Sequence, residues 1–277
     1  MVISRIKTGL SVLVVLAILV GFSFVTLAGA NVEVTVSYKR GVVNWSKGYI
    51  EAKGMAVPPE NAQTEAQGKL LARRGAIVDG QRRLLEIIKG VRVKGKTTMV
   101  NMMAQDVVRQ SVQGFVKGAE IVNEKWHPEE KMYELTMRLS FPVIRTTVYK
   151  QQKENFAPKK EPVQCPYTGL IIDARGISLT PQIVFQIIDR NGELVYGQTQ
   201  AFYQSAVDSG MVEYDGSLEK AKDSPRVGSN PMIVDAVRVG GDFKTKVVVS
   251  TSDGRRMRNQ LSGTDVFLKT KVIVIMD

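Results

Sequence analysis

The sequence predicts an α+β fold in which an N-terminal helix-on-sheet domain is followed by a mixed, β-rich α/β domain. Three patterns predict it. Residues 61–89 have helical spacing, two strand-like segments flank a polar turn at residues 127–130, and short β-branched segments dominate the later part of the chain. The helix and the strand pair belong to a first domain over residues 31–149, and the short strands to a second over residues 164–277.

The first domain is expected to open with a strand over residues 44–57, because large apolar side chains interrupt a polar stretch that stops at Pro58-Pro59. A long helix from Asn61, ended by Gly90, is predicted to follow. Its apolar or small residues recur at roughly helical spacing, at Ala62, Ala66, Leu70, Ile77, Leu84 and Ile88. Glycine costs about 1 kcal/mol in a helix interior. The glycines of this helix are therefore expected to permit close approach to the sheet; they are Gly68, Gly75 and Gly80.

A second, shorter helix and a strand pair complete the predicted first domain. The helix is expected over residues 106–115, where apolar side chains again share one face. The strands are expected over residues 119–126 and 131–148, with the polar residues 127–130 as the turn between them.

Residues 44–148 carry an ordered set of small and apolar residues. The set is Trp45, Gly54, an alanine-rich helix with Ala66, Ala72, Arg73, Arg74, Ala76, Ile77 and Asp79, then Val91, Val93, Thr97 and Thr98, and Gly114 before the hairpin. This order resembles the Lpp-twenty-type lipoprotein domain and the N-terminal domain of flagellar assembly protein T. The resemblance implies a small α+β envelope domain linked to outer-membrane or flagellar-ring proteins. Unlike the lipoprotein members, this chain has no cysteine directly after its N-terminal apolar run, where the lipid would be attached.

A polar segment with two prolines, residues 150–163, has the composition of a solvated linker and predicts two domains that fold independently. Beyond it, strands are expected over residues 168–174, 182–189, 193–196, 232–239, 245–250 and 269–276. The apolar run 272–275 does not alternate, so it is expected inside a sheet with both faces covered. Helices are expected over residues 198–208 and 253–261.

The N-terminus has the three parts of a secretory signal peptide, which we assign to residues 1–30. Arg5 and Lys7 precede a long apolar run, and the small residues around Ala28 and Ala30 suit cleavage after either. The alternative is a retained anchor, because the run holds about the 20 apolar residues that span a bilayer. The sequence therefore predicts an exported protein, periplasmic or associated with the outer membrane.

The net positive charge of the chain indicates which kind of partner it favours. The precursor carries a formal charge of +11, and removal of Arg5 and Lys7 leaves +9. Such an excess favours anionic surfaces. The densest basic cluster is Arg255, Arg256 and Arg258, and Arg82 and Arg83 face outward from the long helix; these five residues are the predicted patch for an anionic partner. Because the basic residues are scattered and the address is extracytoplasmic, no nucleic-acid partner is expected.

No catalytic, cofactor or metal site is predicted. His127 is the only histidine, so the chain has neither the usual zinc ligands nor a Ser-His-Asp triad. An acidic pair or a calcium site could be formed by Asp173, Asp189 and Asp235. Each of them ends or interrupts a predicted strand, however, where aspartate commonly stabilises a turn. The lone Cys165 is expected to be a spare buried or loop thiol.

Two functions follow from these patterns. The first is a non-enzymatic structural or assembly component of an outer-membrane or flagellar apparatus, which binds envelope or flagellar proteins or a second copy of itself through sheet edges and the helix face. The alternative is a periplasmic hydrolase or ligand-binding protein with an unrecognised site. A deep cleft with converging carboxylates would favour the alternative.

Overall fold

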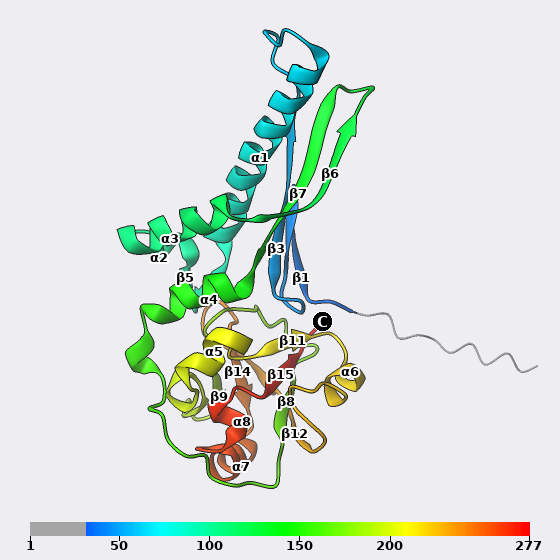
Figure 1. The fold of residues 1–277 in the computed structure, drawn as a ribbon. Coiled ribbons are helices and arrows are strands. Elements are labelled where there is room, and N and C mark those ends of the chain that lie inside the picture. The colour runs from blue at the N-terminus through cyan, green and yellow to red at the C-terminus, as the bar shows by residue number, and fades with distance from the viewer. Residues whose placement is uncertain (1–31) are drawn as a thin grey trace, which may run out of the picture. The chain divides into compact units, whose positions relative to one another are not determined.

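The structure, a computed structural model, describes residues 32–277 of the chain. The predicted signal peptide, residues 1–30, lies outside the described residues. Helices and several separate sheets make up the rest, and the fold is α+β as predicted (Figure 1). Across residues 32–277, no helix has both the length and the apolar character needed to span a bilayer.

The first part of the chain is a five-stranded antiparallel sheet covered on one face by a long helix. The strand order is β1 (Thr35–Tyr38), β2 (Gly41–Asn44), β3 (Tyr49–Ala56), β7 (Met132–Ser140) and β6 (Glu120–His127). Helix α1 (Glu65–Gly90) packs along β3 and β7 (Figure 1). The strand predicted over residues 44–57 is therefore the end of β2, a turn at Gly48 and the whole of β3.

The face of α1 that meets the sheet consists mainly of small residues spaced four apart. Its buried residues are Gly68, Ala72, Ala76, Gly80, Leu84, Ile87 and Ile88. A Cβ added to Gly54 of β3 would overlap the carbonyl oxygen of Ala76, and one added to Gly80 would lie 2.9 Å from Met137 Sδ. The predicted close approach at Gly80 is confirmed, and Gly54 supplies the matching gap on the strand.

Leu70 was predicted to lie in the core of this helix, and that assignment is wrong because its side chain is 68% exposed. Leu70 follows the buried Gly68 by two positions, which places it roughly 200° further around the helix, on the opposite side. Ala66 precedes Gly68 by two positions and is exposed for the same reason. The aliphatic residues near the start of α1 therefore misled the choice of face, whereas Leu84 and Ile88 are buried as predicted.

Strands β6 and β7 pair as the predicted hairpin, but the second strand is shorter than expected. It ends at Ser140, where α4 (Phe141–Lys150) begins with Pro142 in its first turn. Proline suits the first turn of a helix, and the β-branched residues that follow had favoured a strand. Between α1 and β6 lie a two-stranded sheet, β4 (Arg92–Lys94) with β5 (Thr97–Thr98), then α2 (Met99–Met102) and α3 (Asp106–Lys117).

The second part, predicted as a mixed β-rich domain, contains two sheets. One is entirely parallel, in the order β11 (Glu213–Asp215), β15 (Val272–Ile275), β8 (Gly169–Asp173) and β12 (Pro231–Asp235). The other is mixed, in the order β10 (Leu194–Tyr196), β9 (Ile187–Asp189), β14 (Lys246–Val249) and β13 (Arg238–Gly240). All of β15 is buried, as its unbroken apolar run predicted.

Short helices surround these two sheets. They are η1 (Lys153–Asn155), η2 (Gln198–Gln200), α5 (Tyr203–Ser209), α6 (Leu218–Lys222), α7 (Thr251–Leu261) and α8 (Asp265–Leu268). The helix predicted over residues 198–208 is thus divided into η2 and α5. Helix α7 starts two residues before its predicted start, because Ser250 caps it: Ser250 Oγ accepts from the amide of Asp253 at 3.0 Å.

The described residues form one compact unit, and the two parts share a hydrophobic core. The ring of Trp45 lies edge-on to Phe141 at 5.0 Å and to Tyr214 at 5.7 Å, between ring centroids. Residues 150–163 were predicted to form a solvated linker. The structure differs, because Phe156 is buried and stacks edge-on with Tyr149 and Tyr203. The domain boundaries and independent folding stay predictions, and the shared core favours joint unfolding.

The face of α1 can be tested by one pair of substitutions. Leu84→Ala is expected to lower the free energy of unfolding by about 2 to 5 kcal/mol, because it leaves a cavity at a fully buried site. Leu70→Ala, its matched control on the exposed face, is expected to change it by only about half a kcal/mol. Urea unfolding followed by circular dichroism measures both, and equal losses would contradict the assigned face.

Candidate functional site

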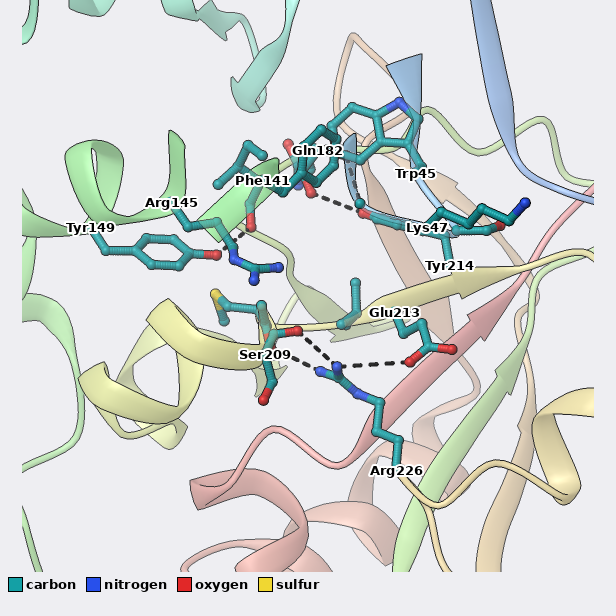
Figure 2. A pocket seen from close by; sticks show the side chains of 16 residues that line it. Trp45, Lys47, Phe141, Arg145, Tyr149, Gln182, Ser209, Glu213, Tyr214 and Arg226 are labelled. Atoms are coloured by element: carbon teal, nitrogen blue, oxygen red, sulfur yellow. Dashed lines mark hydrogen bonds and ion pairs between the residues drawn. The ribbon is translucent and has the colours of Figure 1, made fainter. Parts of the chain in front are cut away.

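A cavity of about 160 Å³ lies where the first and second parts of the chain meet (Figure 2). Its walls come from the turn between β2 and β3, from α4, from the segment between α5 and β11, and from the loop after α6. The lining residues with polar or aromatic side chains are Trp45, Ser46, Lys47, Phe141, Arg145, Tyr149, Gln182, Ser209, Glu213, Tyr214 and Arg226. Arg145 and Arg226 are the two arginines on its walls.

Arg145 enters the cavity from α4. Its Nε donates to the carbonyl oxygen of Val207 at 3.1 Å, and its Nη2 to that of Asp208 at 2.7 Å. These are carbonyls of the last turn of α5, which the helix itself leaves without partners. Gly210 lies beside the guanidinium: its φ is +78°, and a Cβ added there would lie 2.8 Å from Nη1 of Arg145. Glycine therefore provides both the turn and the space for Arg145.

Arg226 enters from the opposite side, and Figure 2 shows the two guanidinium groups turned toward one another. Its Nη1 donates to the carbonyl of Ser209 at 2.8 Å, and its Nη2 to those of Gly210 at 2.9 Å and Thr270 at 2.6 Å. The side chain is only 12% exposed. Together, the two arginines bond four consecutive carbonyls, from Val207 to Gly210, and so fix the segment that leads into β11.

The electrostatic balance of the cavity is positive. Glu213 is the carboxylate on its wall, and its Oε2 lies 4.0 Å from Nη1 of Arg226. Burial lowers the pKa of both arginines and raises the pKa of Glu213, since it removes water from their charged forms. The neighbouring charge of Arg226 also lowers the pKa of Arg145. A buried cation without a matched anion is costly, so this site favours negative charge.

Two buried tyrosines hold the walls in place. Tyr149 donates its hydroxyl to the carbonyl of Ile183 at 2.8 Å, and Tyr214 donates to the carbonyl of Gln182 at 3.0 Å. Burial raises the pKa of both tyrosines, which keeps them protonated. Because each hydroxyl already has a backbone acceptor, these side chains act as rigid wall groups beside the arginines.

The five arginines predicted as one patch lie in two places. Arg82 and Arg83 are on α1, where both are ion-paired to Asp79 and Glu86. Helix α7, which carries the other three arginines, lies apart from α1, at the bottom of the view in Figure 1. On α7, Arg256 pairs with Asp253, and Arg258 Nη2 lies 2.9 Å from carboxylate oxygens of both Asp189 and Glu193. Arg255 is exposed and has no ion pair within residues 32–277. A role for any of them toward an anionic partner stays a prediction.

The acidic candidates are also separated. Asp173 and Asp235 are register partners on β8 and β12, but Asp173 is paired with Arg175, and Asp189 belongs to the other sheet. Nowhere in the described part of the chain do three or more histidine, cysteine or acidic side chains gather in a way that suits a metal ion. His127 is the last residue of β6 and partly buried, not a fully solvated turn residue, and Cys165 is a partly buried free thiol.

Sequence reasoning missed both arginines of the cavity. A signal for Arg145 existed, because it is the single charge within the apolar and β-branched run 143–149, where a buried face is expected. Its neighbours were assigned to a strand, which hid the helix that points it inward. Arg226 lies in a short loop among Ser, Pro and Gly residues, and its local pattern gives no signal of burial.

The ion pair of Arg258 generates a test with a pH dependence. Burial opposes the charge of Asp189, yet hydrogen bonds from Arg258 and from the amides of Glu193 and Asn191 outweigh burial and lower its pKa. Arg258→Gln is expected to cost about 1 to 3 kcal/mol of stability at neutral pH, because it leaves the fully buried Asp189 with weaker compensation.

The lowered pKa of Asp189 determines how the stability contributed by this ion pair changes with pH. Stability from the charged Asp189 is present above the unfolded pKa, about 3.9, and is lost as pH falls through the lower folded value. The difference between the wild type and Arg258→Gln is therefore expected to shrink below about pH 4. Arg255→Gln is the control, with little effect at any pH. Urea unfolding across pH checks this, and a difference independent of pH would count against the pairing.

Comparison with known proteins gives one resemblance. The family model described as Treponema pallidum Tp0624, second domain, matches residues 169–277, which begin at β8 and include both sheets of the second part. The matched residues contribute Arg226 and Glu213 to the cavity, whereas Arg145 lies outside them. None of the curated proteins compared with the chain matches it. The second part of the chain thus resembles this Tp0624 domain.

Proposed function

We propose that the chain is an exported, non-enzymatic cell-envelope protein that serves as a structural or assembly component of an outer-membrane or flagellar apparatus. The signal-peptide pattern of residues 1–30 supports export to the periplasm or the outer membrane. The resemblance of residues 44–148 to Lpp-twenty-type and flagellar assembly domains supports the apparatus. The partners are envelope or flagellar proteins, or a second copy of the chain.

The observation that carries the assembly role is the open edge of the first sheet at β1. All four residues of β1 are exposed, its sequence is Thr-Val-Ser-Tyr, and no other described strand pairs with its outer side. It contains no charge, no proline and no bulge in its pairing with β2. An exposed edge of this kind offers unpaired backbone groups to a strand of another chain.

The opposite edge of the same sheet provides the contrast. β6 carries Glu120, Glu124 and Lys125, and its register with β7 shifts between Ile121 and Asn123. Charge and bulges are the means by which proteins protect sheet edges from pairing. Since β6 is protected and β1 is not, strand addition at β1 is the contact that this sheet favours.

Photocrosslinking in the living cell tests the assembly role. A benzophenone side chain in place of Val36 is expected to give adducts with an envelope protein or a second copy, because Val36 is exposed in the middle of the open edge. The same group in place of Val163, which is exposed in the segment before β8, is the matched control and is expected to give few adducts. Adducts are resolved by mass spectrometry after cell fractionation.

Two results would contradict the proposal. One is recovery of the chain, with its first 30 residues intact, in the cytoplasmic fraction. The other is an adduct pattern at Val36 that is unchanged by Ser37→Pro, since proline removes an amide from the edge and should weaken strand pairing.

A further inference from the structure

The arginine cavity holds positive charge that the rest of the described protein does not neutralise. Its wall carries three basic residues, Lys47, Arg145 and Arg226, against the single carboxylate Glu213 among its lining residues. Lys47 is already paired with Glu33, at 2.6 Å. Glu213 lies at the 4.0 Å limit of pairing with Arg226. Arg145 makes no ion pair within residues 32–277, and the charge of Asp208 only partly offsets the burial that lowers its pKa.

Each of the two arginines also has a nitrogen whose N–H makes no hydrogen bond within the described residues. Arg145 uses Nε and Nη2 on carbonyls, and its Nη1 donates to no group of the described residues. Arg226 uses both terminal nitrogens, and its buried Nε has no partner in the described chain. A guanidinium has five N–H donors in a planar fork that matches carboxylate and phosphate oxygens. The cavity therefore presents one free donor, Nη1 of Arg145, as well as charge to an anion.

The dimensions of the site limit the size of the anion. Sites for drug-sized molecules have volumes of about 300 to 1,000 Å³, whereas this cavity measures about 160 Å³. One small charged group fits such a space. The aromatic rings of Trp45 and Phe141 form an apolar wall near it, which reduces competition from water and strengthens charge-assisted hydrogen bonds (Figure 2).

We propose that this cavity binds one small oxyanion, a carboxylate or a phosphate group, which accepts a hydrogen bond from Nη1 of Arg145 and lies between the guanidinium groups of Arg145 and Arg226. The carbonyl bonds of the two arginines hold the donors in place before the anion enters. Binding then needs little reorganisation of the protein. The anion offsets the repulsion between the two cations. This site is separate from the open edge at β1, and its test is independent of the assembly role.

The competing explanation is purely structural: the two arginines serve only to bond the carbonyls at the end of α5. In that case removal of Arg145 lowers stability but changes no binding, because none exists. Titration calorimetry of the full exported chain separates the two explanations. Inorganic phosphate and acetate are the two probes, which distinguish a tetrahedral from a planar oxyanion, and sodium chloride at matched ionic strength is the reference.

The wild-type protein is expected to bind at least one of the two probes with a stoichiometry of one and with no equivalent heat from chloride. Arg145→Gln is expected to weaken that binding by about tenfold or more, the loss of one charge-assisted hydrogen bond. Arg190→Gln, which removes an equal charge from an exposed turn outside the cavity and outside the predicted patch, is the matched control and is expected to bind as the wild type does.

Should Arg145→Gln fail to fold by circular dichroism, Arg145→Lys replaces it, because lysine keeps the charge but lacks the planar fork. It too is expected to bind more weakly than the wild type. The proposal is overturned if the wild type binds neither phosphate nor acetate above the chloride reference. It is also overturned if the folded Arg145 variant and Arg190→Gln bind equally well.

Discussion

Four consecutive backbone carbonyl oxygens at the end of α5, from Val207 to Gly210, depend on two arginines for their hydrogen bonds. The end of a helix leaves its last carbonyls without internal partners, and burial makes such orphans costly. Arg145 comes from the first part of the chain, whereas Arg226 and the bonded segment belong to the second, so the bonds of Arg145 join the two parts. The segment leads directly into β11, which places Tyr214 against Trp45. This polar junction therefore joins the two parts beside the shared core.

The same junction makes the cavity electropositive. A guanidinium bonded to carbonyls is satisfied as a donor, but its net charge persists, since a carbonyl contributes a dipole and no opposite charge. Burial of these cations raises the free energy of the folded state and lowers the pKa of both arginines, and the charge of Arg226 adds a smaller lowering at Arg145. Neutral side chains could donate hydrogen bonds to the same carbonyls without any repulsion between charges. The retained charge is the reason to look for an anion here.

Local patterns predicted the elements whose structure is decided locally. The long helix, the β6–β7 hairpin, the buried β15 and the α7 region follow from periodicity, turn residues and capping, which act over a few residues. The errors arose where tertiary packing decides. Small residues at four-residue spacing chose the inner face of α1 over the larger Leu70, and Pro142 allowed a helix where β-branched residues favoured a strand. The division of the second part into two sheets, and the meeting of Arg145 with Arg226, depend on pairings between residues about 60 to 100 positions apart in the sequence, which local patterns do not encode.

The open edge and the arginine cavity share one short stretch of chain. The residues that precede β1 are bonded to the turn that forms a wall of the cavity: the amide of Val34 donates to Ser46 Oγ at 2.9 Å, and the amide of Trp45 donates to the carbonyl of Val34 at 2.8 Å. The Glu33–Lys47 ion pair adds a third link. Contact alone does not couple two sites, because a ligand shifts a conformation only by its difference in affinity between two states. These three links fix the strand relative to the cavity in a single arrangement. A rigid connection of this kind favours independent binding at the two sites, with free energies that add.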